Sequence, residues 1–172
     1  MSNQLTKSFI KEVVRLLEFE EGVSSTSYIC PTGHPTIGYG YKLDEKEIEH
    51  EATSELPYRV SHRMARTMLK GVLVDLHLEL TARCQMYSRL STSLDTDMAR
   101  KAIVMSMAYQ MGVQGYLDFE NTREYGRKGL WALMASEMLD SKWYREDTQE
   151  RAIAHSRVIA SGDIGQNYEG RA

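Results

Sequence analysis

Three glutamates, Glu18, Glu20 and Glu21, crowd the predicted last turn of the first helix. The helix dipole and the neighbouring carboxylates both disfavour ionisation at that end, so an upward pKa shift is expected there. A carboxyl group that keeps its proton near neutral pH can donate it to a leaving oxygen as a general acid. Glu21 abuts Gly22 and a turn-rich segment, from which it could face a cleft between two lobes. A solvated acidic helix end is the alternative interpretation.

The residues on either side of Glu21 predict the elements that position it. Apolar residues at helical spacing from Phe9 to Leu17 predict an amphipathic helix that ends at Glu21 and Gly22. The stretch from Ser27 to Tyr41 is rich in Tyr, Ile and Thr and is interrupted by glycine and proline. These residues favour strands and turns, and the Pro-Thr-Gly-His segment at 31–34 is the predicted tip of a β-hairpin.

The remainder of the chain predicts helices. Apolar residues recur at about every fourth position from Val60 to Leu80, which indicates a helix of about six turns. The segment from Met98 to Tyr109 is apolar on all sides, which is typical of a helix in the core. A last helix is predicted to begin at a box-like Asp147-x-x-Glu150 cap and to end at Gly162.

These elements predict a mostly helical α+β fold, in which residues 1–172 form a single domain. A small β-hairpin lobe is expected at 23–60 and a connecting helix at 61–82. Residues 83–172, together with 1–22, are expected to form a helical lobe.

Composition excludes several classes of protein. The chain has 21 Lys and Arg against 24 Asp and Glu, a net charge of −3, and no cluster of five basic residues, so nucleic-acid binding is not expected. Cys30 and Cys84 cannot form a disulfide framework, and the histidines show no metal-ligand spacing, so no metal is predicted. No secretory signal is seen in residues 1–11 and no apolar run of about 18 residues follows, so synthesis in a cytoplasm without stable membrane insertion is expected.

The spacing after Glu21 resembles an active-site signature. Cys30 follows after eight residues and Thr36 after five more, within Thr-Ile-Gly-Tyr-Gly. This pattern resembles the signature of phage-type lysozymes, the endolysins of glycoside hydrolase family 24, in which the middle position is Asp or Cys. Later blocks, such as Tyr-Gln-Met-Gly at 109–112 and Ser-Lys-Trp-Tyr at 141–144, resemble the same family in the same order. The resemblance implies a lysozyme-like fold over nearly the whole chain.

The resemblance also implies a reaction. The family cleaves the β-1,4 bond between N-acetylmuramic acid and N-acetylglucosamine in peptidoglycan, without a metal or an organic cofactor. Glu21 would then be the general acid, while Cys30 and Thr36 would hold and help to activate the attacking water, which implies inversion. Cys30 replaces the Asp of the best-known members. With an ordinary pKa of about 8.5, its thiol is expected to be mostly neutral at pH 7, and attack by a Cys30 thiolate with retention is the less favoured alternative.

Alignment with the family implies four substrate-binding positions and one supporting residue. The substrate-binding positions fall on Lys42, Tyr109, Thr122 and Glu137. Lys42 and Glu137 replace uncharged residues, which predicts altered subsites, and Tyr109 has core packing as its alternative role. Arg151 matches a family arginine near the catalytic glutamate, where it would balance the charge of the site.

The resemblance further implies a role and partners. A monomeric, bacteriolytic endolysin would be made in the host cytoplasm and would reach the peptidoglycan of the periplasm with the help of a holin-type membrane permeabiliser. Three other functions stay open. They are a lytic transglycosylase on the same bond, a peptidoglycan peptidase or amidase that pairs Cys30 with His34, and an inactive lysozyme-like binding module.

Overall fold

The fold is known from a computed structural model, which describes residues 7–44, 46–48, 59–90 and 95–168. Its helices outnumber its strands by far, and the predicted mostly helical α+β class is confirmed. The chain divides into two units: unit 1 comprises residues 1–13 and 76–172, and unit 2 comprises residues 14–75. No helix in the described part of the chain has the length and apolar content needed to cross a membrane.

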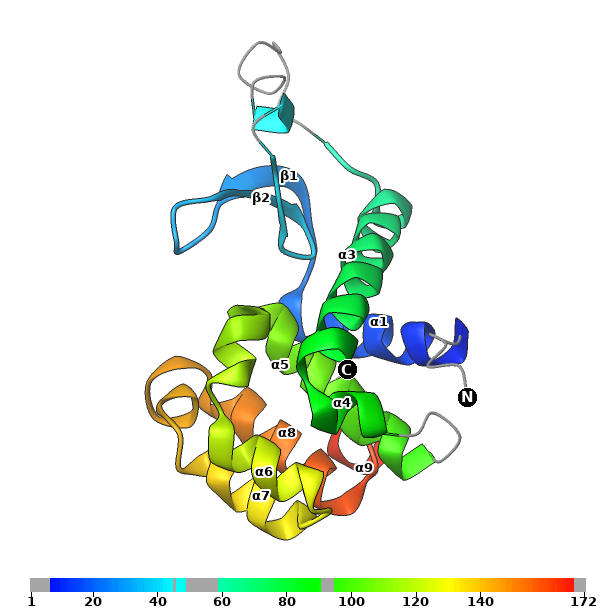
Figure 1. The fold of residues 1–172 in the computed structure, drawn as a ribbon. Helices are drawn as coiled ribbons and strands as arrows, with labels where there is room; N and C mark the ends of the chain where they lie inside the picture. The colour runs from blue at the N-terminus through cyan, green and yellow to red at the C-terminus, as the bar shows by residue number, and fades with distance from the viewer. Residues whose placement is uncertain (1–6, 45, 49–58, 91–94, 169–172) are drawn as a thin grey trace. The chain divides into compact units, whose positions relative to one another are not determined.

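Unit 2 holds the end of the first helix and a small sheet (Figure 1). Helix α1 (Lys7–Glu21) ends where predicted, because Gly22 adopts a φ of 65°, a left-handed conformation that stops a helix. The antiparallel sheet has the order β1-β2-β3, formed by β1 (Ser24–Ile29), β2 (Pro35–Gly38) and β3 (Tyr41–Lys42). The predicted tip at 31–34 does connect β1 to β2.

The long helix predicted after residue 60 is α3 (His62–Arg83), with 22 residues. In unit 2 its buried face consists of Ala65, Leu69 and Leu73, which are at most 2% exposed. The end of β2 approaches this helix closely, since a Cβ atom on Gly38 would lie 3.2 Å from the Cβ of Ala65. Gly38 also has a φ of 66°, so both the space and the backbone conformation favour glycine here.

Unit 1 is helical. Its further elements are α4 (Gln85–Arg89), α5 (Asp95–Leu117), α6 (Glu120–Arg127), α7 (Trp131–Leu139), η1 (Trp143–Asp147), α8 (Gln149–Ser161) and α9 (Gly165–Tyr168). Helix α8 packs against α5 and α7, and α6 packs against α4 and α7 (Figure 1). The segment 102–105 of α5 is fully buried, which confirms the core helix predicted from its all-round apolar character.

One predicted helix start is wrong. Helix α8 begins at Gln149, with Thr148 as its N-cap, so Asp147 and Glu150 form no capping box. The reason is the π-helical turn η1, in which the backbone N–H of Thr148 donates a hydrogen bond to the carbonyl of Trp143 over five residues. This turn places Asp147 in the preceding element. The predicted end at Gly162 is confirmed by its left-handed conformation.

Candidate functional site

The first predicted site residue, Glu21, is the last residue of α1 and its side chain is exposed. Gly22 turns the chain directly after it, so the carboxylate lies at the point where the helix leads into β1. Cys30 and Thr36 belong to the same unit, on the hairpin that follows. The three residues of the signature therefore come from one helix end and one hairpin.

Cys30 lies at the turn between β1 and β2. Its backbone N–H donates to the carbonyl of His34 at 3.0 Å, and its own carbonyl accepts from the N–H of Gly33 at 2.8 Å. The tip is tight because Gly33 adopts a φ of 82°. This geometry brings the Cys30 Sγ to 3.0 Å from the Oγ1 of Thr32.

Hydrogen bonds around the sulfur change its acidity. Chiefly the hydroxyl of Thr32, and then the backbone of His34 and the side chain of Thr36, lower the pKa of Cys30 to about 6, against a smaller opposing effect of burial. A thiol with that pKa is mostly ionised at pH 7, so the expectation of a neutral thiol was wrong. The sulfur can therefore supply a negative charge at the position where many family members have Asp.

Thr36 is buried in the middle of the sheet, with 2% of its surface exposed. It pairs with Tyr28 on β1 and with Lys42 on β3. Its hydroxyl donates a hydrogen bond to the carbonyl of His34 at 2.9 Å. Thr36 thus fixes the turn that carries Cys30, and the exposed Lys42 lies beside it on the neighbouring strand.

Tyr28 connects Glu21 with Cys30 electrostatically. Burial raises the pKa of its phenol, and the negative charges of Cys30 and then Glu21 raise it further, so the phenol lies within electrostatic reach of both groups. No role was predicted for Tyr28 from the sequence. The spacing in the sequence could have indicated that Tyr28 lies near Cys30. Residues two apart along an extended chain point to the same face, and Tyr28 precedes Cys30 by two residues.

A second group of side chains forms hydrogen bonds near the end of α1. Nothing in the sequence indicated this group. The Tyr39 hydroxyl donates to the Glu18 Oε1 at 3.1 Å and lies 2.6 Å from the Nε2 of His62. Arg66 donates to the Glu18 Oε2 at 2.7 Å and forms an ion pair with the same carboxylate. Glu18 lies one helical turn before Glu21, so this group connects the end of α1 with α3 and with the turn that follows β2.

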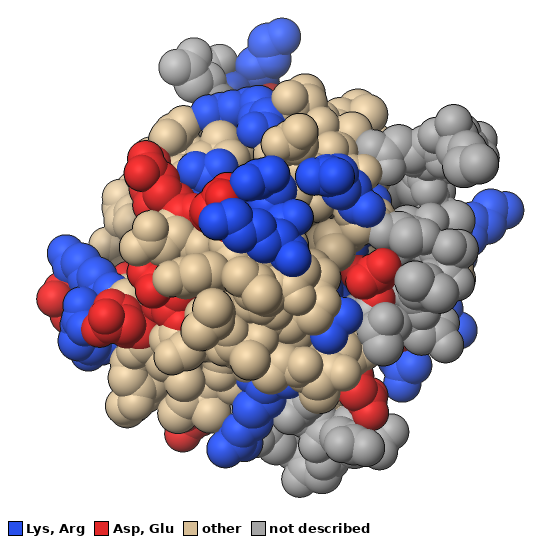
Figure 2. Space-filling view, turned by 60° about the horizontal axis from the view of Figure 1, so that its bottom comes forward, with Lys and Arg blue, Asp and Glu red and all other residues tan. Residues whose placement is uncertain are grey.

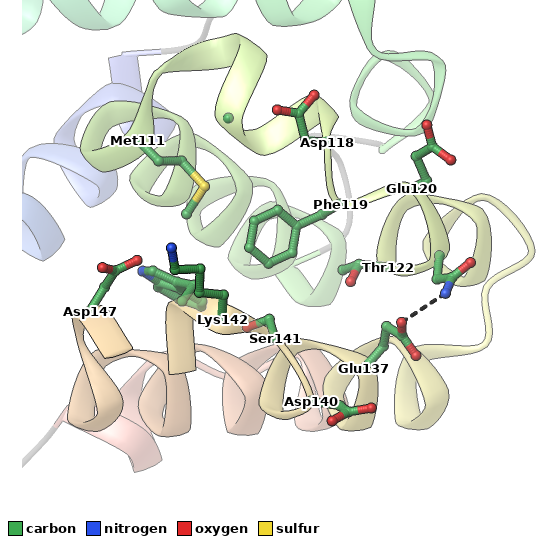
Figure 3. Close-up of a pocket in the computed structure, with 13 residues that line it drawn as sticks. Met111, Asp118, Phe119, Glu120, Thr122, Glu137, Asp140, Ser141, Lys142 and Asp147 are labelled. Atoms are coloured by element: carbon green, nitrogen blue, oxygen red, sulfur yellow. Dashed lines mark hydrogen bonds between the residues drawn. The ribbon is translucent and has the colours of Figure 1, made fainter. Parts of the chain in front are cut away.

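The other substrate positions inferred by alignment lie in unit 1. Thr122 on α6 and Glu137 on α7 line a cavity of about 570 Å³ (Figure 3), whereas Tyr109 and Arg151 do not. Tyr109 is half-buried on α5, and Arg151 is half-buried on α8. Glu137 accepts a hydrogen bond from the Asn121 amide at 2.9 Å. The structure therefore brings two of the four positions together.

The described residues contain no group of His, Cys, Asp and Glu side chains arranged to hold a metal ion. On the face shown in Figure 2, groups of basic side chains have acidic side chains beside them. Ion pairs join charged side chains of unit 1, among them Glu124 with Arg127 and Asp140 with Arg145.

Comparison with known proteins agrees with this geometry. The sequence model of the phage lysozyme family matches residues 18–156. The chain is 24% identical over 167 residues to a probable T4-type lysozyme 1 of Dictyostelium discoideum, in a match covering 90% of this chain and 97% of that protein. It is also 24% identical over 167 residues to the pre-baseplate central spike protein Gp5 of Enterobacteria phage T4, with 88% of this chain and 28% of the spike protein covered.

These matches confirm the predicted resemblance to phage-type lysozymes of the T-even kind. The family match spans the helix end at Glu21, the hairpin and most of unit 1. The chain therefore belongs to the phage lysozyme family, and this membership supports a lysozyme-like enzyme that acts on peptidoglycan.

Proposed function

We propose that the chain is a muramidase, which hydrolyses the β-1,4 bond between N-acetylmuramic acid and N-acetylglucosamine in bacterial peptidoglycan. One observation carries the proposal: Tyr28 lies within electrostatic reach of both the helix-end carboxylate Glu21 and the acidic thiol Cys30. Glycoside hydrolysis requires a proton donor and an anion, and Glu21 and Cys30 are the candidates for these two groups.

In this mechanism Glu21, in its protonated form, donates its proton to the glycosidic oxygen as the bond to the leaving sugar breaks. The Cys30 thiolate accepts a hydrogen bond from a water molecule, and its negative charge stabilises the positive charge that develops on the sugar. Thr36 holds the hairpin turn in place and contributes to keeping Cys30 ionised. The water attacks the anomeric carbon from the opposite face, gives up a proton to the Cys30 thiolate, and inverts the configuration of that carbon.

Loss of turbidity of chloroform-treated Gram-negative cells tests the assignment of Glu21. We expect Glu21→Gln to lose activity by about two orders of magnitude or more, because it removes the general acid. Glu12→Gln, on the same helix, is the matched control and should retain activity. An inactive wild-type protein would support a binding module instead, and full activity of Glu21→Gln would overturn the catalytic assignment.

Product analysis separates the related reactions. Hydrolysis releases reducing ends, whereas a transglycosylase forms an anhydro-muramic product and a peptidase or amidase releases amino groups; mass spectrometry distinguishes the three. NMR of the first-formed anomer tests the stereochemistry, and an α product is expected. A β product would indicate that the Cys30 sulfur bonds to the anomeric carbon as the glycosidic bond breaks, with water displacing it afterwards.

The biological role proposed for this activity is that of an endolysin, which causes lysis of a bacterial host. The protein would then act as a monomer on periplasmic peptidoglycan after a holin-type partner has permeabilised the membrane. Fractionation of expressing cells with and without such a partner tests the role. We expect lysis only when this protein and the membrane permeabiliser are both present. Release of the protein across an undamaged membrane would contradict its dependence on the permeabiliser.

A further inference from the structure

The helix end that carries Glu21 has an unfavourable local charge. Helix α1 ends with Glu18, Glu20 and Glu21, and its last turn contains no basic residue. Carboxylates near the C-terminus of a helix face the negative end of the helix dipole, and like charges three or four residues apart repel one another. The last carbonyl groups of a helix also lack partners within it. This turn therefore tends to fray unless other elements hold it, and fraying would move Glu21.

Arg66 of α3 supplies the first part of the support for this turn. Its Nη2 donates a hydrogen bond to the Glu18 Oε2 at 2.7 Å, and its Nε forms an ion pair with the Glu18 Oε1. Two parallel contacts from a guanidinium group to one carboxylate fix the orientation of that carboxylate as well as offsetting its charge. The Glu18 side chain is only 18% exposed, so the pair is partly shielded from water. Glu18 is thereby anchored to α3.

Tyr39 supplies the second part, and its hydroxyl lies between two neighbours. Tyr39 belongs to the turn after β2 and is 3% exposed. Its hydroxyl oxygen lies 3.1 Å from the Glu18 Oε1 and 2.6 Å from the His62 Nε2, and the phenol and imidazole rings meet edge to face. A phenol has one proton, so it donates to only one of these two groups at a time. The position of the proton on His62 decides which group that is.

The direction of these hydrogen bonds follows from what each atom can donate or accept. The Glu18 carboxylate, paired with Arg66, only accepts, so its bond to Tyr39 requires the phenol proton. Burial and the bond to Glu18 raise the pKa of Tyr39, so the phenol keeps that proton at neutral pH. The His62 Nε2 must then carry a hydrogen and donate it to the phenol oxygen. With the opposite tautomer, Nε2 would accept the Tyr39 proton, and no hydrogen would lie between the phenol oxygen and Glu18.

We propose that Tyr39 and His62 are positioning residues for the reaction at Glu21. His62 directs the Tyr39 hydroxyl to Glu18. Tyr39 and Arg66 then hold Glu18 one helical turn before the acid, so the last turn of α1 keeps the acid in one orientation. The inference rests on the proposed function for the chemistry. Its location rests on these contacts, because His62 on α3 and Tyr39 after β2 lie outside the three residues of the signature.

Saturation kinetics of the full chain on soluble glycan strands of peptidoglycan test the proposal. We expect Tyr39→Phe to lower kcat about tenfold and to leave KM within about twofold, because it disturbs the proton donor and not the binding of the sugar. Leu73→Val, in the buried face of α3, is the matched control, because it loses stability outside this group and should keep the wild-type kcat. Circular dichroism confirms that each variant is folded under the assay conditions. An unchanged kcat of Tyr39→Phe, or an equal loss in Leu73→Val, would overturn the proposal.

Variants of His62 separate a hydrogen-bond donor from a packing role. His62→Gln offers an amide N–H close to the place of Nε2 and should keep kcat close to wild type, whereas His62→Leu should lower kcat about as much as Tyr39→Phe. The double variant of His62→Leu and Tyr39→Phe should lose no more activity than either single variant, because both substitutions break one chain of hydrogen bonds. Independent, multiplied losses, or equal activities of the Gln and Leu variants, would overturn the joint action of the two residues.

Two measurements without substrate keep this inference separate from the proposed function. Nitrogen NMR shifts of His62 at pH 7 should show a hydrogen on Nε2, and an Nε2 without a hydrogen would overturn the direction of the bonds. Amide hydrogen exchange of residues 19–21 should become about tenfold faster in Tyr39→Phe than in the wild-type protein, and unchanged exchange would overturn the positioning of the helix end. If both results are as expected but the wild-type protein releases no reducing ends, the muramidase alone is overturned.

Discussion

The Sγ of Cys30 lies 3.0 Å from the Oγ1 of Thr32, inside a turn closed by the hydrogen bond from Cys30 to His34. This relationship lowers the pKa of Cys30 to about 6 and so gives a thiol the charge of a carboxylate at neutral pH. A hydroxyl two residues away thus decides the ionisation of the middle residue of the signature.

The rate of Cys30 alkylation by iodoacetamide should follow this pKa. The thiolate is the reactive form, so the rate should rise with pH through a midpoint near 6 and level off above it. Thr32→Val removes the largest contribution and should move the midpoint upward, toward that of an ordinary cysteine. Labelling is followed by mass spectrometry of the Cys30 peptide, and a midpoint near 9 in the wild-type protein would contradict the prediction.

Tyr39→Phe should destabilise the protein. The substitution removes the hydroxyl that bonds to Glu18 and His62 while the ring stays buried, and we expect a loss of about 1–2 kcal/mol in the free energy of unfolding. Chemical denaturation measures the change. Tyr28→Phe is the control, because that phenol is 42% exposed, and its stability should stay close to wild type. Equal effects of the two substitutions would show that the hydroxyl of Tyr39 contributes no net stability.

Lys101→Met should stabilise the protein at neutral pH. The side chain is 1% exposed, its ammonium lies 4.7 Å from the ring centroid of Tyr87 and 5.6 Å from that of Phe9, and no ion pair with a described residue offsets its burial. Burial lowers the pKa of Lys101, so charging it costs free energy in the folded state. Replacing a buried charge by a methionine of similar volume removes that cost.

The lowered pKa of Lys101 also determines how the stability of the protein changes with pH. Because the pKa is lowered on folding, the unfolded chain binds more protons, and wild-type stability should rise as the pH approaches the ordinary lysine value of about 10.4. The advantage of Lys101→Met should therefore shrink at high pH. Thermal unfolding over pH 6–10 measures the difference in melting temperature between Lys101→Met and the wild-type protein. Lys70→Met is the control, because Lys70 is exposed. A lower melting temperature of Lys101→Met at every pH would show that the ring contacts outweigh the burial cost.

Two glycine substitutions should have opposite effects. A Cβ atom on Gly126 of α6 would collide with the Sδ of Met86 and would lie 2.9 Å from that of Met134, so Gly126→Ala should cost about 1–3 kcal/mol. Gly71 of α3 has nothing within 4 Å of such an atom, and Gly71→Ala should gain up to about 1 kcal/mol from helix propensity. Urea unfolding of both variants compares them, and a stable Gly126→Ala would mean that the methionines can move aside.

Local sequence signals predicted much of the fold. The end of α1 at Glu21, the hairpin tip at 31–34 and the buried α5 each depend on contacts between residues close in the chain, or on a periodic apolar pattern, and all three are confirmed. The start of α8 was mispredicted because the π-helical turn at 143–147 depends on how that segment packs and leaves no simple pattern in the sequence.

The sequence by itself determined the residues of the signature and their spacing, since the order Glu21, Cys30, Thr36 is a property of the chain and needs no coordinates. Only the tertiary structure decided what those residues can do. The acidity of Cys30, the bracing of Glu18 by Tyr39 and the carboxylate-lined cavity beside Thr122 depend on distances of a few ångströms between side chains. Hydrogen bonding, burial and charge act over such distances, and packing sets them where residues far apart in the chain meet.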